Sequence, residues 1–189
     1  MPAAEARARI TAATARLLDD RPFRELTVDA VMAEAGLART VFYRHFDGLP
    51  GIVLALLAEL RDDVLGQARV IPPGERAAIL RSSLAATVDG YARHHGLLLA
   101  LDHAARHDVA VERAYRAIAD GAIAGVAAVI EAGIARGELR PLPAFEVARG
   151  LALLNNTYLL DAFGREPPVT PESALEALWT IWSRTVGLD

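Results

Sequence analysis

Cysteine is absent from this chain of 189 residues. Its absence removes disulfides, thiolate zinc sites, iron–sulfur clusters and cysteine nucleophiles together. A long apolar segment is missing as well, since the longest uninterrupted apolar or glycine run, residues 121–130, is about half of what a membrane-spanning helix needs. The first residues place no apolar stretch behind a basic one, so they do not resemble a signal peptide. We therefore expect a cytoplasmic protein with no membrane partner.

The chain also has no excess of positive charge. Hydrophobic residues make up 53% and charged residues 23%, which suits a packed globular protein and is unlike a disordered one. The net charge of −4 argues against a protein that coats nucleic acid nonspecifically, because such binding depends on many cations. Residues 1–50 carry seven arginines and seven acidic residues, so the deficit lies in residues 51–189. Any anionic partner is therefore expected to meet residues 1–50.

The spacing of apolar residues follows the helical period throughout, and no alternating strand pattern competes with it. The sequence therefore predicts an all-α fold of nine helices, and the turn Pro72-Pro73-Gly74 marks a boundary within the chain. The expected helices are residues 3–19, 28–35, 38–45, 50–68, 75–94, 97–106, 109–136 and 144–163, and a last one after Pro171.

The second and third expected helices form a helix-turn-helix pattern. Thr27 is a plausible N-cap for the first of them, and Gly36 ends it. In the helix expected over residues 38–45, Phe42 and Phe46 are four residues apart and would face the core. The opposite face would carry the groups that bond base edges and phosphates, namely Arg39, Thr40, Tyr43 and Arg44. Spacing alone leaves a second interpretation open, because two short amphipathic helices around a glycine also occur in ordinary bundles.

The residues themselves are more specific than their spacing. Residues 26–46 read LTVDAVMAEAGLARTVFYRHF, which resembles the DNA-binding head of the TetR family of repressors, and Tyr-Arg-His-Phe is its most specific part. The resemblance covers about residues 5–60 and implies a nine-helix TetR-like fold, with a DNA-binding domain over residues 1–48 and a ligand-binding and dimerisation domain over residues 49–189. It implies bases contacted by Arg39, Thr40, Val41 and Arg44, and phosphates contacted by Thr27, Tyr43 and His45.

Two positions depart from the family pattern. The family usually has serine or threonine where Ala38 stands, and lysine where Leu49 stands, and both contact phosphates in the family. Each missing cationic contact lowers the salt dependence of DNA binding by about one. The resemblance therefore implies a shallower salt dependence than that of a member which carries the lysine.

Polar groups on the apolar helix over residues 144–163 indicate where a ligand would bind. Asn155 and Asn156 stand in a strongly apolar segment, and a buried amide must find hydrogen-bond partners. A ligand is one possible partner. The alternative is a bond within the core, or at a seam between subunits.

From Ala128 onward the chain resembles the C-terminal half of the ethionamide-resistance type of TetR regulator. The supporting segments are AVIE (128–131), LPA (142–144), LLN (153–155), AFG (162–164) and TIW (180–182). In that subgroup an asparagine at the place of Asn155 and a tryptophan at the place of Trp182 border an apolar channel. Ala152 replaces a second asparagine of that pocket, and Leu80 and Thr87 stand where aromatic residues are usual. We assign Trp179 to packing, and the expected ligand-binding residues are Leu80, Ser83, Thr87, Asn155 and Trp182.

Catalysis and metal binding have little support in the sequence. His103 and His107 lie four residues apart beside Asp102 and Asp108, but no third aligned ligand is evident, so solvated histidines explain them better. Glycine-rich phosphate loops, Gly-x-Ser-x-Gly and His-Glu-x-x-His motifs are absent. We expect neither an enzyme nor a cofactor.

The function implied by the resemblance is that of a transcriptional regulator, expected to be a repressor. Its partners would be a palindromic double-stranded DNA operator, a small hydrophobic effector that releases it, and a second copy bound through the last two helices. Two rivals remain open at this stage. One is a helical lipid-binding or scaffold protein that keeps the head without using it, and the other is catalysis on a small molecule in the body.

Overall fold

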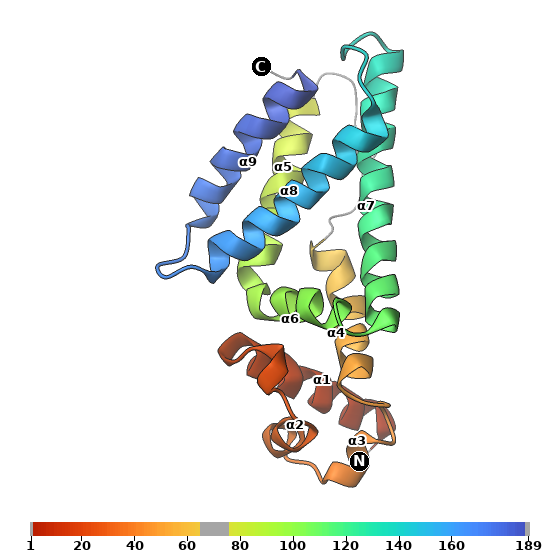
Figure 1. Cartoon of the computed structure of the whole chain (residues 1–189), viewed down its shortest axis with the longest axis vertical. Helices are drawn as coiled ribbons and strands as arrows, with labels where there is room; N and C mark the ends of the chain where they lie inside the picture. The colour runs from red at the N-terminus through yellow and green to blue at the C-terminus, as the bar shows by residue number, and fades with distance from the viewer. Residues whose placement is uncertain (1, 65–75, 188–189) are drawn as a thin grey trace. The chain divides into compact units, whose positions relative to one another are not determined.

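The computed structural model of the chain describes residues 2–64 and 76–187. Within those residues the chain forms nine α-helices and one short 3-10 helix, with no strand, which confirms the predicted all-α class (Figure 1). Two compact units divide the chain, Met1–Arg61 with His94–Arg116 and Asp62–Arg93 with Ala117–Asp189. The division by function into residues 1–48 and 49–189 stays a prediction.

The first unit begins with α1 (Ala3–Asp20), which packs against α2 (Val28–Ala35) and α6 (His95–Ala105). The 3-10 helix η1 (Phe23–Glu25) lies between α1 and α2 in the chain and contacts α6. Next come α3 (Arg39–Phe42) and α4 (Leu49–Val64). The expected apolar stripe of α1 is buried, as are the largest side chains of the other helices of this unit. The fully buried members are Ile10, Ala13, Val31, Phe42, Ile52, Val53 and Leu101.

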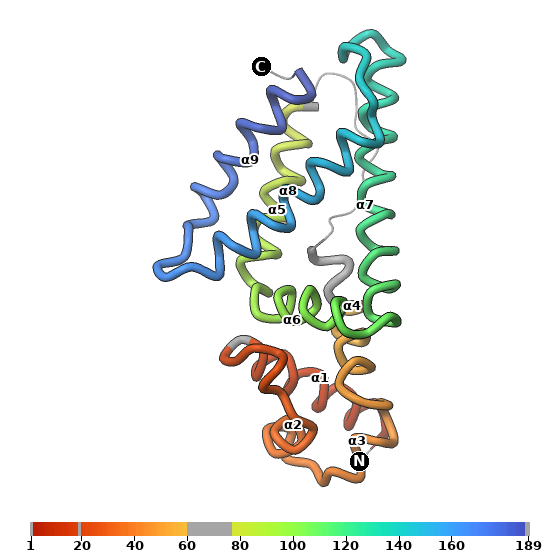
Figure 2. Tube along the Cα trace, in the orientation of Figure 1, coloured from red at the N-terminus to blue at the C-terminus, as the bar shows by residue number. Residues whose placement is uncertain are grey.

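The second unit contains α5 (Arg76–Arg93), most of α7 (Val109–Ala135), α8 (Ala144–Gly164) and α9 (Pro171–Val186). Helix α5 packs against both α8 and α9, and α8 also packs against α9 (Figure 2). Thr170 caps α9, because its hydroxyl accepts a hydrogen bond from the Ser173 amide. One apolar cluster joins α7, α8 and α9, and its buried members are Ile123, Ala127, Ile130, Leu139, Ala144, Ala148 and Val186.

The third helix is shorter than predicted. We expected residues 38–45, but the α-helix covers only Arg39–Phe42. The next residues continue as turns, in which the Arg44 amide donates to the Val41 carbonyl at 3.2 Å and the His45 amide to the Phe42 carbonyl at 2.9 Å. Ala38 stands at the N-cap, and its methyl group cannot accept a bond from the first amides of the helix. The tighter turns still place Phe42 and Phe46 in the core, as predicted.

The fourth helix begins at Leu49, one residue before the prediction, and is described to Val64. Its expected end at Ala68 and the boundary turn Pro72-Pro73-Gly74 lie outside the described residues. The expected start of the fifth helix at residue 75 also lies outside the described residues. All other ends of the expected helices agree with the structure to within two residues.

Within the described residues, α7 is the one helix whose length and composition would allow it to cross a membrane. The sequence expectation that no segment is long and apolar enough counted only uninterrupted apolar runs. Mean hydropathy over a longer window of α7, with charged residues counted, does reach the level of a membrane-spanning helix, so that expectation is wrong for α7. Ile123, Ala127 and Ile130 of α7 are nevertheless buried in the core of the second unit. These contacts are those of a helix that contributes to a protein core.

Candidate nucleic-acid interface and ligand-binding region

Helix α2, which precedes the turn to α3, is capped at both ends. The Thr27 hydroxyl accepts a hydrogen bond from the Ala30 amide at 3.1 Å, which confirms Thr27 as the predicted N-cap. At the other end Gly36 adopts φ 62°, a left-handed conformation that glycine adopts without strain. The Arg9 guanidinium of α1 donates to the Ala35 carbonyl at 2.6 Å and so satisfies a carbonyl at the end of α2. These contacts determine the direction in which the chain enters α3.

The third helix divides its side chains between the core and solvent. Phe42 is fully buried, and its ring lies 5.6 Å from that of Phe46. Tyr43 is 54% exposed even though its ring meets Phe42 edge to face at 5.4 Å. The predicted reading residues occupy the solvent side: Arg39, Thr40, Tyr43 and Arg44 are exposed, and Val41 and His45 are half-buried. This arrangement is what a helix that enters the major groove requires.

Arg39 belongs to a small surface network. Its Nη1 atom donates to both carboxylate oxygens of Asp29 on α2, at 2.8 and 2.7 Å. Its Nη2 atom donates to the Tyr43 hydroxyl at 3.4 Å. The bond to Tyr43, followed by the charge of Asp29, raises the pKa of Arg39 above its ordinary value, so the guanidinium stays charged at any working pH. The network is exposed, with 58% of the Arg39 side chain and 67% of the Asp29 side chain accessible.

Arg7 of α1 contacts the residues that follow α3. Its Cζ lies 4.6 Å from the centre of the Phe46 ring, a cation–π distance, and its Nη1 donates to the His45 carbonyl at 3.3 Å. The sequence prediction named none of Arg7, Arg9 and Asp29. Their contacts join residues that are 10 to 38 positions apart, and the helical period gives no signal for such pairs.

Two asparagine–aromatic pairs stand in the second unit. The Trp182 indole Nε1 donates to Asn155 Oδ1 at 3.0 Å, and both side chains are buried. The Tyr91 hydroxyl of α5 donates to Asn156 Oδ1 at 2.8 Å. The sequence left open whether a ligand or the protein itself bonds these amides. In the structure, protein side chains donate to both amide oxygens. Trp182, assigned to the pocket from sequence, lies in the core, while Trp179 is half-buried with the Arg81 guanidinium 5.5 Å above its ring.

The three predicted ligand-binding residues of α5 differ in exposure. Leu80 is half-buried and packs against the apolar cluster of the second unit. Thr87 is half-buried, and its hydroxyl donates to the Ser83 carbonyl at 3.0 Å. Ser83 is exposed. Because α5 packs against α8 and α9, the helices that bear Leu80, Asn155 and Trp182 are neighbours in the second unit.

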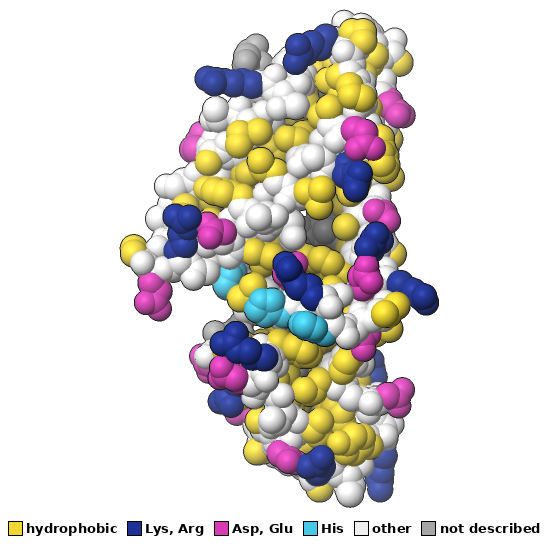
Figure 3. All heavy atoms as spheres, in the orientation of Figure 1, with side chains coloured by type: hydrophobic (Ala, Val, Ile, Leu, Met, Phe, Trp, Pro, Cys, Tyr) yellow, Lys and Arg dark blue, Asp and Glu magenta, His cyan; other side chains and the backbone are white. Residues whose placement is uncertain are grey.

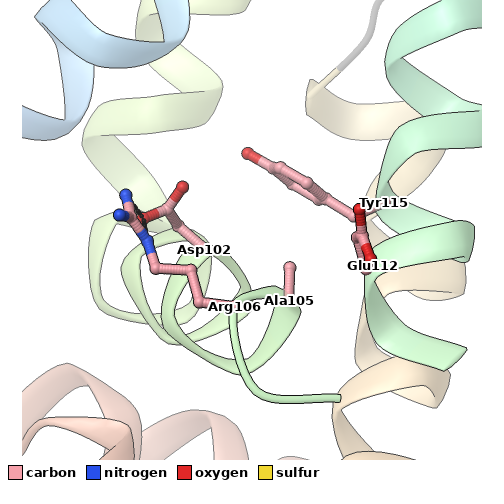
Figure 4. Close-up of a pocket in the computed structure, with 5 residues that line it drawn as sticks. All are labelled: Asp102, Ala105, Arg106, Glu112 and Tyr115. Atoms are coloured by element: carbon pink, nitrogen blue, oxygen red, sulfur yellow. Dashed lines mark hydrogen bonds and ion pairs between the residues drawn. The ribbon is translucent and has the colours of Figure 1, made fainter. Parts of the chain in front are cut away.

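An open hollow of about 460 Å³ lies elsewhere, in the first unit (Figure 4). In Figure 4 the Tyr115 ring points across the hollow toward Asp102, whose carboxylate accepts a bond from Arg106 Nη2 at 2.9 Å. Ala105 and Glu112 complete the lining, and none of the predicted ligand residues belongs to it. His103 and His107 gather no third metal-binding side chain among the described residues.

Apolar side chains are exposed on α8 and α9. Leu153, Leu154 and Phe145 of α8 are 57%, 37% and 50% exposed, and Ile181 of α9 is 40% exposed. Figure 3 shows apolar side chains gathered on the face of the second unit that includes α8. We call these four residues the exposed apolar residues of α8 and α9. Exposed apolar patches on a soluble protein often indicate a protein contact surface.

The braced α2–turn–α3 segment, with its exposed polar face, defines the first unit as a helix-turn-helix DNA-binding head. Comparison with known proteins gives the family. Residues 10–56 match the model of the bacterial regulatory proteins of the tetR family, and residues 80–187 match the model of the C-terminal domain of the transcriptional regulator EthR. The chain belongs to the TetR family of helix-turn-helix transcriptional regulators, as the resemblance implied.

Individual relatives agree with this assignment. The chain is 31% identical over 183 residues to the HTH-type transcriptional regulator EthR of Mycobacterium tuberculosis, and the match covers 94% of this chain and 85% of EthR. Among solved structures, Salmonella enterica GusR superimposes with a TM-score of 0.76 at 16% identity, covering 96% of this chain and 95% of GusR. The TetR-family regulator PfmR of Thermus thermophilus gives a TM-score of 0.74 at 16% identity, covering 92% and 96%. These two structures support the fold.

Proposed function

We propose that this chain is a cytoplasmic repressor that binds a palindromic operator and releases it when a small apolar ligand binds the second unit. The observation that carries the DNA-binding part is the division of α3, with Phe42 buried and the polar residues around it exposed. In this arrangement Arg39, Thr40, Val41 and Arg44 contact bases. Thr27, Tyr43 and His45 contact phosphates.

The residues suit these roles chemically. Arginine forms a bidentate pair with guanine, and threonine bonds base edges or contacts the thymine methyl group. The Tyr43 hydroxyl and the His45 ring can donate to phosphate oxygens. Thr27 already uses its hydroxyl oxygen as an acceptor in the N-cap, so its O–H is the group that donates to a phosphate.

Selection of bound sequences from a random duplex pool tests the DNA-binding part. We expect a palindromic consensus with half-sites about one helical turn, or about 34 to 36 Å, apart, because two heads of a dimer meet successive major grooves. Arg39→Ala should lose discrimination at one base pair of each half-site, by about five- to 150-fold. Arg16→Ala is the matched control, because Arg16 is an exposed arginine of the same unit that pairs with Glu34. A pool that yields no consensus would refute the proposal.

The homodimer is proposed to form through α8 and α9, which pair with their twofold mates into a four-helix bundle. The exposed apolar residues of α8 and α9 support this, because pairing would remove apolar surface of Leu153, Leu154, Phe145 and Ile181 from water. Ile181→Glu would place a charge in that interface. Sedimentation should then show monomers, while Ser173→Glu, an exposed change at the start of α9, should leave the dimer intact.

The proposed ligand site is built from Leu80, Ser83, Thr87, Asn155 and Trp182. Asn155 supports it, since its amide is a polar group in an apolar setting and a ligand that displaces Trp182 can take over its bond. Such a ligand would favour a conformer with a different head spacing, and operator affinity falls by the ratio of the ligand affinities for the two conformers.

Tryptophan fluorescence tests the ligand site, because the chain has only two tryptophans. The variant Trp179→Phe reports on Trp182 alone, and Trp182→Phe reports on Trp179 alone. A panel of small apolar amides and ketones should shift the emission of the first variant and release operator DNA at the same concentrations. Ligands that shift the emission yet leave operator affinity unchanged would refute the switching mechanism and leave DNA binding intact.

A further inference from the structure

Asp29 is an acidic residue on the DNA-binding head, two residues after the N-cap Thr27. A carboxylate at such a place repels DNA phosphates unless a cation neutralises it. Asp29 is 67% exposed, so burial does not explain its place in the structure. Its carboxylate instead receives both of its side-chain hydrogen bonds from one atom, Arg39 Nη1.

The same contacts leave the Nε–H and one Nη2–H of the Arg39 guanidinium without a hydrogen-bond acceptor in the described residues. Nη1 is occupied by Asp29, and Nη2 donates one of its two hydrogens to Tyr43. Among the described residues Arg39 Nε makes no hydrogen bond. On the planar group the Nε–H lies beside one of the two Nη2–H bonds. These two parallel donors are what a bidentate contact with guanine O6 and N7 uses.

We propose that Asp29 is a positioning residue for base readout, which holds the Arg39 guanidinium so that its Nε–Nη2 edge faces the base. This inference rests on the proposed function. Tyr43 completes the support, because its ring lies 6.0 Å below the Arg39 Cζ and its hydroxyl accepts from Nη2. An arginine held in this way loses less side-chain freedom when it binds a base than one that moves in solvent.

Asp29 acts on binding selectivity, with little effect on folding. Exposed ion pairs contribute little to stability, so the unfolding midpoint of Asp29→Ala should match that of the unaltered protein. Without Asp29 the Arg39 guanidinium is no longer held in place, and this should weaken binding to the consensus by about two- to tenfold per head. Duplexes that lack the base pair read by Arg39 should bind as before, because the bond that Asp29 supports is not made there.

The experiment uses the full chain and duplexes that carry the consensus selected by the unaltered protein. The base pair at which Arg39→Ala loses discrimination is taken as the one that Arg39 contacts. Affinities for the consensus and for the duplex changed at that pair are then measured for Asp29→Ala, Asp29→Asn, Arg39→Ala and the double variant. Glu34→Ala is the control for net charge, because Glu34 is on the same helix and pairs with Arg16, away from α3.

The proposal predicts that Asp29→Ala loses discrimination at the base pair read by Arg39 and that Asp29→Asn loses less. Once Arg39 is alanine, Asp29→Ala should leave discrimination at that base pair unchanged, although affinity for all duplexes can rise alike as a repelling charge is removed. Glu34→Ala should leave discrimination unchanged. Tighter binding of Asp29→Ala to all duplexes would overturn the proposal, since Asp29 would then only repel phosphates. A loss of discrimination that persists without Arg39 would overturn it too, because Asp29 would then contact the bases itself. If Arg39→Ala loses binding and Asp29→Ala does not, the positioning role fails while the proposed function stands.

Discussion

The bond between Trp182 and Asn155 gives the sharpest prediction of stability. Asn155→Ala removes the amide oxygen that accepts the Trp182 Nε1–H, and both side chains are at most 9% exposed. A buried donor that loses its acceptor costs about 1 to 3 kcal/mol. For a chain of this length each kcal/mol lowers Tm by about 2 to 4 °C, so Tm should fall by about 2 to 12 °C.

Thermal unfolding gives the change in Tm and urea unfolding the change in free energy, both at one fixed protein concentration, because the proposed dimerisation would make stability depend on concentration. Thr157→Ala, an exposed change on the same helix, is the control and should stay within about 0.5 kcal/mol. The double variant with Trp182→Phe separates the bond from packing, since residues in contact couple by about 0.5 to 3 kcal/mol. Additive losses in the double variant, or a loss from Asn155→Ala no larger than that of Thr157→Ala, would refute the role of the bond.

Three further predictions concern the head. Phe42→Ala should cost about 3 to 5 kcal/mol in urea unfolding, because it empties a fully buried site, and a loss below 1 kcal/mol would contradict the packing. Gly36→Ala should cost about 1 to 2 kcal/mol, since Gly36 has φ 62° and its new Cβ would lie 3.1 Å from Arg9 Nη2; Gly36→Asn should cost less, and equal losses would contradict the left-handed turn. Leu49→Lys should steepen the salt dependence of operator binding by about one per head, and an unchanged slope would show that no phosphate lies nearby.

Most helices could be predicted from the sequence because local signals determine them. Apolar spacing sets the faces of α1 and α9, and Pro171 and Gly187 stand where α9 begins and ends. The third helix could not be placed in the same way. It is one turn long, and its limits depend on hydrogen bonds with the residues that follow, which propensity does not determine.

The candidate sites were predictable in part for a similar reason. The residue types of α3 indicate which side chains project, because the positions of Phe42 and Phe46 define the buried face. A buried amide at Asn155 requires a partner, yet the sequence cannot say that the partner is Trp182, 27 positions away on another helix. Asp29 and Arg39 are likewise brought together by the left-handed turn at Gly36, and no periodic pattern encodes their contact.

The number of arginines in residues 1–50 overstates the positive charge that these residues can offer to DNA phosphates. Five of the seven arginines in residues 1–50 are engaged within the protein: Arg9 on the Ala35 carbonyl, Arg7 on the His45 carbonyl, Arg16 on Glu34, Arg24 on Glu25 and Arg39 on Asp29. An arginine that braces a helix or offsets a carboxylate contributes less phosphate neutralisation than an unpaired one. If the chain binds an operator as proposed, we expect its affinity to depend more on base contacts and fit than on total positive charge. A shallow salt dependence, already implied by leucine at position 49, follows independently from these contacts.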